Sequence, residues 1–182
     1  MELLLSSNDR RIDLIREGFD FVVRIGVLHD SGLMKRHLGN LQMLNCASPE
    51  YLQKYGHPKS LNDLENHYLI HYQSIQGINS DQFEYVTVQG ETHNLNMRSM
   101  LTVNTTESYT EACIAGLGII QVPIIGIREA LSSGKLVPIL ANFTPNPMPV
   151  SILYPHRRNL TKRVSVFMDW ISDAIKRDYL TQ

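Results

Sequence analysis

The sequence predicts an α/β protein built from two lobes. Segments rich in β-branched and aromatic residues alternate with segments of helical periodicity along the 182 residues, which is typical of layered α/β folds with mostly parallel strands. Connector-like stretches at 47–50 and 143–149 bracket a middle block. We therefore expect one lobe built from 49–145, inserted into a lobe built from 1–48 and 146–182. Lobes joined by two crossings usually bind small ligands in the cleft between them.

The first 48 residues predict strands around one helical segment. A short apolar run at 2–7 precedes helical spacing over 9–18, which ends at Gly18. The segment 19–26 is β-rich and nearly all apolar, as expected of a strand buried on both faces. Residues 38–48 are predicted to form a further strand.

Capping residues then predict two short helices. Ser48 is a candidate N-cap, Pro49 suits the first helical position, and Gly56 ends this helix. The second helix begins at Ser60 and covers 60–67.

Strands dominate the next part of the chain. The segments 68–73 and 99–104 have the composition of strands, and 83–97 alternates around Gln89-Gly90, which predicts a hairpin. Behind Pro123 a helix is expected to end near Gly134 and to lead into another strand.

The chain is expected to close with a strand and a long helix. Prolines flank the predicted strand Val150–Tyr154. In 161–177 the apolar residues recur on one helical face, which makes this segment the clearest amphipathic helix in the chain: Val164, Phe167, Met168, Ile171 and Ile175.

Composition and charge exclude some classes of protein. Apolar residues make up 43% and charged residues 19%, and 17 Lys plus Arg nearly balance 18 Asp plus Glu, so bulk charge does not predict nucleic-acid binding. No apolar run approaches the ~20 residues that span a bilayer. The N-terminus has no basic region of a signal peptide, so we expect a cytoplasmic chain whose Cys46 and Cys113 are buried.

The chain offers little catalytic or metal chemistry. His67 and His71 have zinc-like i, i+4 spacing, but the intervening residues favour a strand, which would direct the two imidazoles by a period of two. A G-x-S-x-G, an H-E-x-x-H and a P-loop are all missing. Gly116 and Gly118 follow a helical pattern, which favours a helix end and a turn over a dinucleotide loop. We expect no catalytic residue, metal or cofactor.

The stretch TTES at 105–108 has two interpretations. Ser108 and Glu111 fit a capping box, and Thr105 or Thr106 could cap a helix that starts earlier. There are nevertheless more hydroxyls than one cap needs, and a helix N-terminus behind a strand can hold a carboxylate. Local sequence leaves the cap and the ligand site as equal alternatives.

Several motifs in order give the chain a family resemblance. DRRIDLIREGFD, VRIG, ASPEYL and GHPKSLNDL are followed by VNTTESYTEACIAGLGIIQVP, LVPIL, VSILYP and the closing RVSVFMDWI. Together they resemble the effector-binding domain of LysR-type transcriptional regulators, and the likeness covers almost the whole chain.

The resemblance implies a two-lobed, periplasmic-binding-protein-like (type 2) fold with a small effector, a carboxylate being one candidate, between the lobes. It places effector-binding positions at the end of one strand in the first lobe, at the crossing, and at a helix start and strand end in the second lobe: Arg24, Ile25, Gly26, Ala47, Ser48, Thr105, Thr106, Glu107, Ser108, Val122 and Pro123.

The chain also departs from the family pattern. Regulators of this family begin with a helix-turn-helix and a linker helix, which are missing here together with the first strand and helix of lobe I. The resemblance thus implies an N-terminally truncated sensor that associates with itself and reaches promoter DNA only through the missing segment. The alternative is a stand-alone small-ligand binding or assembly module. Neither interpretation involves a membrane.

Overall fold

The computed structural model of the protein describes residues 2–7, 13–28, 32–73, 79–80, 82–156 and 160–180. The chain divides into two compact units. Unit 1 contains Met1–Arg11, Leu44–Val122 and Ile127–Pro145, and unit 2 contains Ile12–Met43, Pro123–Gly126 and Asn146–Gln182. Helices and sheets mix within the chain, so the predicted α/β class is confirmed. The lobe boundaries expected from the sequence stay a prediction.

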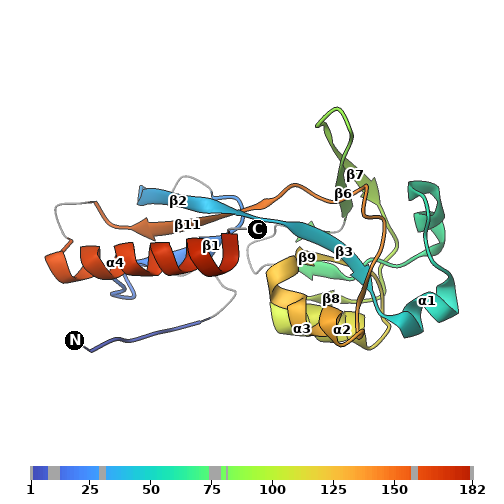
Figure 1. Ribbon diagram of the computed structural model, residues 1–182, viewed down its shortest axis with the longest axis horizontal. Coiled ribbons are helices and arrows are strands. Elements are labelled where there is room, and N and C mark those ends of the chain that lie inside the picture. The colour runs from blue at the N-terminus through green and yellow to red at the C-terminus, as the bar shows by residue number, and fades with distance from the viewer. Residues whose placement is uncertain are drawn as a thin grey trace. The chain divides into compact units, whose positions relative to one another are not determined.

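Unit 2 is a three-stranded sheet covered by a helix. Strand β11 (Met148–Tyr154) lies between β1 (Val22–Ile25) and β2 (Met34–Leu41) and runs antiparallel to both. Helix α4 (Lys162–Ile175) lies along this sheet (Figure 1) and continues into a π-helical turn, Lys176–Leu180. The core between sheet and helix is formed by Leu38, Leu41, Val150, Ile152, Tyr154 and Met168.

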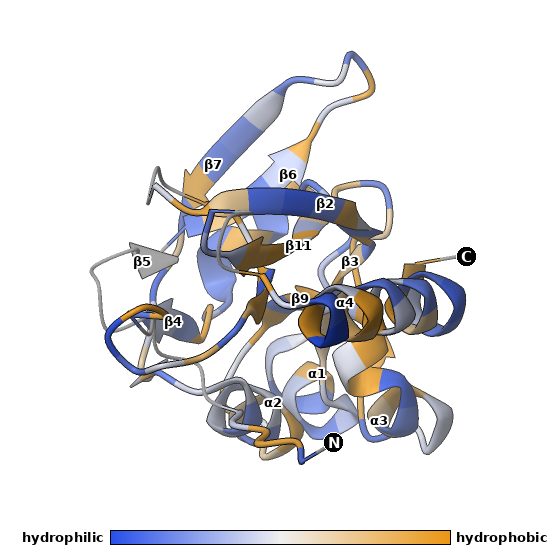
Figure 2. Cartoon of the chain, turned by 90° about the vertical axis from the view of Figure 1, so that its left-hand side faces the viewer, coloured by the Kyte–Doolittle hydropathy of each residue, from blue (hydrophilic) through white to orange (hydrophobic). Residues whose placement is uncertain are grey.

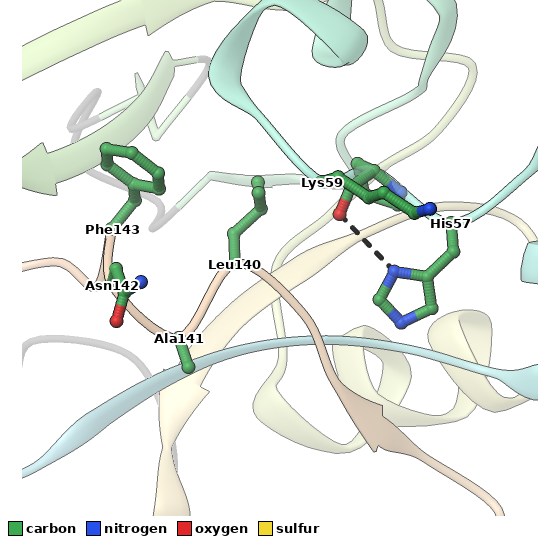
Figure 3. A pocket seen from close by; sticks show the side chains of 7 residues that line it. His57, Lys59, Leu140, Ala141, Asn142 and Phe143 are labelled. Atoms are coloured by element: carbon green, nitrogen blue, oxygen red, sulfur yellow. Dashed lines mark hydrogen bonds between the residues drawn. The ribbon is translucent and has the colours of Figure 1, made fainter.

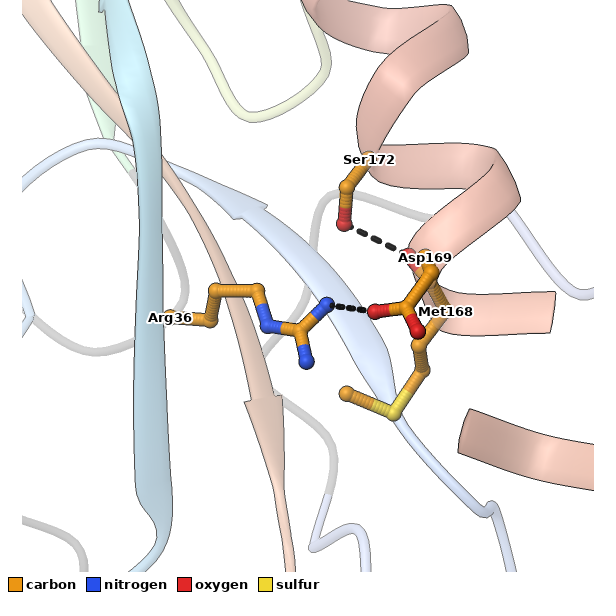
Figure 4. A network of polar contacts seen from close by, with 4 residues as sticks. All are labelled: Arg36, Met168, Asp169 and Ser172. Atoms are coloured by element: carbon orange, nitrogen blue, oxygen red, sulfur yellow. Dashed lines mark hydrogen bonds and ion pairs between the residues drawn. The ribbon is translucent and has the colours of Figure 1, made fainter. Parts of the chain in front are cut away.

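Helix α4 is held by its cap and by one ion pair to the sheet. The Thr161 Oγ1 accepts a hydrogen bond from Val164 N–H at 3.4 Å, which satisfies one of the free donors of the first turn. The Arg36 guanidinium on β2 reaches Asp169 at 2.6 Å (Figure 4). Both side chains are partly exposed, so packing of the apolar face contributes more to holding α4 than this ion pair does.

The start of the chain differs from what its sequence predicts. Residues 2–7 form no strand, and Leu4 and Leu5 are more than four-fifths exposed. Of the helix expected over 9–18, the residues up to 12 lie outside the described residues, and the rest forms a turn with Leu14 buried and Ile15 exposed. The segment 19–26 shortens to β1, a half-buried edge strand, so the prediction of burial on both faces is wrong.

Unit 1 holds the remaining strands. One sheet has the order β10 (Val137–Pro138), β3 (Met43–Ala47), β9 (Ile120–Pro123), and another the order β5 (Asn79–Ser80), β4 (His71–Gln73), β8 (Thr102–Val103). The predicted hairpin is present as β6 (Gln82–Val86) and β7 (Thr92–Asn96), with Gly90 at a φ of 83° in its turn.

Parallel pairing is less common than the alternation of elements predicts. β4 and β8 are parallel, whereas β1–β11, β2–β11, β3–β10, β4–β5 and β6–β7 are antiparallel. The expectation of mostly parallel strands is therefore wrong. Tight hairpins and returning segments make these pairs, whereas parallel pairs need longer crossover connections.

The helices of unit 1 follow their caps. Ser48 caps α1 (Pro49–Tyr55) by accepting from Tyr51 N–H at 3.3 Å, and Gly56 ends it, as predicted. Ser60 and Asp63 form a capping box on the 3-10 helix Leu61–Asn66. Three more helical segments complete the chain's helices within the described residues: α2 (Thr106–Ile114), the 3-10 turn Ile124–Ile127 and α3 (Arg128–Ser132).

The strand expected over 38–48 is two strands. It breaks at Gln42, whose carbonyl accepts from Ile124 N–H at 3.0 Å. The two halves pair with different partners, β2 with β11 and β3 with β9 and β10. Tertiary pairing therefore interrupts a run whose local composition is continuous.

Unit 1 has two apolar clusters and two buried thiols. One cluster surrounds Ile70, Ile120 and Leu136, and the other surrounds Tyr51, Phe83 and Ile119. Cys46 and Cys113 are free and fully buried, which confirms the sequence prediction. Within the described ranges, no helix combines the length and the apolar character that a bilayer crossing requires.

Candidate functional site at the start of helix α2

The helix N-terminus at 105–108 comes directly behind a parallel strand. Strand β8 ends at Val103, and Thr105 has the extended backbone of an N-cap, with φ −128° and ψ 146°. Its Oγ1 accepts from Ser108 N–H at 3.2 Å. Thr105 is therefore the cap, one of the alternatives that the sequence left open. The capping box of Ser108 and Glu111 is wrong, because Ser108 already lies in the first turn.

A chain of hydroxyls leads outward from this cap. The Thr105 hydroxyl donates to Ser108 Oγ at 2.9 Å, so Ser108 can direct its own hydrogen elsewhere. Thr110 Oγ1 donates to the Thr106 carbonyl at 3.1 Å, so the Thr110 hydroxyl hydrogen is already bonded within the helix. All four residues from Thr105 to Ser108 are exposed. Of the hydroxyls at 105, 108 and 110, that of Ser108 is the donor left for a ligand.

Gly116 and Gly118 lie at the C-terminal end of α2 and just after it, where the backbone requires glycine. The Gly116 N–H donates to Cys113 O and the Leu117 N–H to Ala112 O, with Gly116 at a φ of 77°. This is the Schellman pattern that commonly ends helices. At Gly118 a Cβ would lie 2.8 Å from the Tyr68 carbonyl, so only glycine lets these two backbones approach. The interpretation as a helix end and a turn is confirmed.

A partly buried polar network connects α2 to neighbouring strands of unit 1. Gln121 on β9 donates from Nε2 to Asn45 Oδ1 at 2.7 Å and to the Glu84 carbonyl at 2.8 Å, and its Oε1 accepts from Glu84 N–H at 2.9 Å. The Gln121 N–H donates to the Tyr109 hydroxyl at 3.2 Å. Asn45 then donates from Nδ2 to the carbonyls of Leu140 and Phe143 at 3.3 and 2.9 Å.

This network ties α2 to three strands, and sequence reasoning missed it. Burial raises the pKa of the Tyr109 phenol, so that group stays protonated. Asn45 is fully buried although its amide is polar. The available signal was an amide within each of two apolar strands, LQMLNCA and IIQVP, because buried amides need partners.

The remaining predicted site residues of unit 1 do not join the start of α2. Ala47 and Ser48 are buried, and Ser48 uses its hydroxyl in the α1 cap. Its Oγ lies 3.7 Å from where a Gly116 Cβ would stand, at the other end of a helix that is about 13 Å long. Val122 is 7% exposed and packs in a core cluster.

The predicted residues of the other unit are described separately. Arg24 and Ile25 end strand β1, and the Gly26 N–H donates to the Pro149 carbonyl at 2.8 Å. Arg24 is partly buried and has interactions of its own, while Ile25 is 55% exposed. Pro123 also belongs to unit 2. Their role in effector binding stays a prediction.

The two histidines lie where the sequence expects them. His67 ends the 3-10 helix and His71 begins β4. His67 Nδ1 lies 3.1 Å from the Tyr51 hydroxyl, which in turn accepts from Tyr68 N–H at 2.8 Å. Burial lowers the pKa of His67, although the charge of Asp63 opposes this shift. A neutral ring that accepts from Tyr51 fits both observations.

Unit 1 also has an open pocket of about 290 Å³ (Figure 3). It is lined by His57, Pro58 and Lys59 from one segment and by residues 140–143 from another. None of the site residues predicted from the sequence lines it. The pocket is thus separate from the hydroxyl chain at α2.

The chain matches a known family over nearly its full length. The family model described as LysR substrate binding domain covers residues 1–176. The chain is 44% identical over 180 residues to the uncharacterized HTH-type transcriptional regulator YhjC of Escherichia coli K12. The matched region covers 99% of this chain and 60% of YhjC. It is 32% identical to the HTH-type transcriptional activator AaeR of the same strain, over 88% of this chain and 51% of AaeR.

Solved structures of LysR-type regulators resemble the fold of this chain. The regulatory domain of CrgA from Neisseria meningitidis has a TM-score of 0.75 at 28% identity, covering 93% of this chain and 80% of that one. Full-length AphB, the virulence activator of Vibrio cholerae, has a TM-score of 0.74 at 27% identity, over 95% of this chain and 57% of AphB. These regulatory domains share the periplasmic-binding-protein-like fold.

The chain spans about half to three-fifths of the length of the curated relatives it matches. The part that the chain covers is the substrate-binding domain of LysR regulators, and the proteins similar to it are LysR-type regulators. The chain therefore belongs to the LysR substrate-binding domain family and is an effector-binding regulatory domain of the LysR type.

Proposed function

We propose that this domain senses a small carboxylate through the N-terminus of α2. The observation that carries the proposal is the hydroxyl chain: Thr105 satisfies Ser108 N–H and also donates to Ser108 Oγ, which leaves the Ser108 hydroxyl hydrogen for a ligand. The helix dipole adds a modest ~0.3–1 kcal/mol for an anion at this end. A carboxylate oxygen accepts both kinds of donor, hydroxyl and backbone N–H.

Glu107 affects which ligand charge is favoured at the start of α2. It is exposed in the first turn, where its carboxylate competes with an anionic ligand for the positive end of the helix. A dianionic ligand would meet more repulsion than a monocarboxylate. We therefore infer a preference for monocarboxylates.

The experiment is a thermal-shift screen of small organic acids against their matched amides, followed by calorimetry on any hit. Ser108→Ala should weaken a carboxylate about 2- to 10-fold, the value of one hydrogen bond of ~0.5–1.5 kcal/mol. Glu107→Gln should strengthen it. Ser132→Ala is the matched control, since Ser132 is an exposed helical serine that bonds its own helix.

Two results would reject this site. One is a stabilising acid whose affinity is unchanged in Ser108→Ala. The other is an amide that binds as well as its acid. Arg24→Ala and Pro123→Ala test the residues expected on unit 2 in the same assay, each against wild type.

In the whole regulator we propose that effector binding changes transcription through an N-terminal helix-turn-helix, as the names of the relatives indicate for those proteins. Moving a two-state equilibrium from 1:99 to 99:1 requires about 10⁴-fold preference for one state. The effector must therefore discriminate between two arrangements of the domain. This role is regulatory rather than enzymatic, and it places the protein in the bacterial cytoplasm, where promoters are. Family membership does not favour a stand-alone binding module.

A further inference from the structure

The open pocket of unit 1 is formed by two segments that lie far apart in the chain. His57, Pro58 and Lys59 line it from one segment, and residues 140–143 line it from the other (Figure 3). Its volume of about 290 Å³ is at the lower end of the ~300–1,000 Å³ that ligand pockets occupy. A ligand in this pocket is therefore small.

The wall at 140–143 is held in an unusual backbone conformation. Leu140 has a φ of 46°, and among the described residues no other non-glycine has a positive φ. Asn45 Nδ2 donates to the carbonyls of Leu140 and Phe143, and the Phe143 N–H closes the turn by donating to the Leu140 carbonyl at 2.9 Å. Such conformations persist where the surrounding structure fixes them, and they often occur at ligand sites. The pocket is thus preformed, and a ligand does not have to order its wall.

Apolar side chains line much of the pocket. Leu140 and Pro58 are buried, and Leu140 belongs to the core cluster around Tyr51. Phe143 is half-buried, and its ring lies edge-on to Tyr85, with 6.0 Å between centroids and 84° between planes. The hairpin that carries Tyr85 is mostly hydrophilic along β7 (Figure 2), so the apolar surface for a ligand comes from Phe143, Leu140 and Pro58. Such a surface buries a flat apolar group well.

The pocket also has a cation. Lys59 is exposed, and within the described part of the chain its ammonium takes part in no salt bridge. The Asp63 carboxylate accepts instead from the backbone N–H groups of Lys59 and Ser60, at 2.8 and 2.9 Å. His57 Nδ1 lies 3.3 Å from the Pro58 carbonyl, which only accepts, so this nitrogen carries its hydrogen (Figure 3). The Lys59 ammonium is therefore available to a ligand, and it selects an anion.

We propose that this pocket is a second ligand site of the domain, for a small aromatic carboxylate. The ring packs against Phe143, Leu140 and Pro58. The carboxylate accepts from the Lys59 ammonium. A ligand of about ten non-hydrogen atoms in an open pocket binds weakly, with a dissociation constant of ~1 mM. This proposal is independent of the effector site at α2.

A nuclear magnetic resonance titration of the isotope-labelled full chain locates the ligand. Phenylacetate, added up to ~10 mM, should move the backbone amide signals of Lys59, Ala141 and Asn142 along one saturating curve. Phenylacetamide has the same shape without the charge, and acetate lacks the ring, so each should bind at least about fivefold more weakly. The proposal is overturned if acetate has the same effect as phenylacetate, or if these three signals stay in place.

Lys59→Gln tests the role of the charge. It should weaken phenylacetate about 3- to 10-fold and leave phenylacetamide unchanged. Lys135→Gln is the matched control, since Lys135 is an exposed lysine of unit 1 that does not line the pocket. Equal effects of the two substitutions on phenylacetate overturn the proposal.

Ala141→Phe tests the role of the space. Ala141 is exposed, so the added ring occupies the pocket without replacing a buried side chain. The affinity for phenylacetate should fall at least about tenfold, while amide signals away from the pocket keep their wild-type positions and show that the chain still folds. If this variant binds phenylacetate as well as the wild type does, the ligand lies elsewhere and the proposal is wrong.

Discussion

The two units of the domain are stabilised in different ways. Unit 1 combines two apolar clusters with a partly buried network in which Gln121 and Asn45 satisfy backbone groups from several segments. Unit 2 depends on one apolar layer between a three-stranded sheet and α4. A polar network requires every partner to be in place, whereas an apolar layer tolerates adjustment. We therefore expect unit 1 to adopt one defined arrangement of its side chains, and the core of unit 2 to tolerate changes in packing.

The largest expected effect is in the core of unit 2. Ile152 is fully buried on the central strand β11, and Ile152→Ala should cost about 2–5 kcal/mol, a large share of an ordinary domain's ~5–15 kcal/mol. Thermal unfolding followed by Trp170 fluorescence, which reports on unit 2, should shift more than unfolding followed by far-ultraviolet circular dichroism.

Ile120→Ala is the matched substitution in unit 1, since Ile120 is also fully buried. It should shift the circular dichroism signal with less effect on Trp170. If both variants shift both signals equally, the units unfold together and the comparison fails.

The next effect is in the network of unit 1. Gln121→Leu removes the acceptor of Glu84 N–H and the donor to Asn45 Oδ1 and to the Glu84 carbonyl, which should cost about 1–3 kcal/mol. Urea denaturation measures it. Gln82→Leu is the control, because Gln82 makes a side-chain hydrogen bond to Asn96 at the exposed surface and should change stability by less than about 0.5 kcal/mol. If the two variants lose similar amounts of stability, the network contributes no more to the free energy of unfolding than a surface hydrogen bond does.

The smallest effect is a pH dependence in unit 1. Burial lowers the pKa of His67 below its usual 6.5, so the unfolded chain binds the proton more tightly than the folded chain. The stability from neutral His67 is full above about pH 6.5 and is lost as the pH falls below it. The pKa of Asp63 is also lowered, by N–H groups of Lys59 and Ser60, but its contribution disappears only at more acidic pH.

Melting temperatures at pH 7.5 and 5.5 should therefore differ less in His67→Gln than in the wild type. The exposed His93, replaced in the same way, serves as the control and should leave the difference unchanged. An unchanged difference in His67→Gln would mean that the pKa of His67 is the same in the folded and unfolded chains.

Local features of the fold could be predicted from the sequence. The cap at Ser48, the hairpin turn at Gly90, the helix end at Gly116 and the face of α4 depend on residues within a few positions of one another. The family motifs identified the class of domain because they occur in order along nearly the whole chain. The effector-binding residues predicted from the resemblance remain predictions.

Other features depended on contacts between distant segments. The sequence alone determined the ends of α1 at Ser48 and Gly56 and the end of α2 at Gly116, because these caps and turns are satisfied by neighbours in the chain. Only the tertiary structure decided that the strand over 38–48 breaks at Gln42 and that β1 is a half-buried edge strand. It also joined Asn45 to Gln121 across 76 positions. A buried amide requires a partner, but its sequence does not say which distant group will supply it.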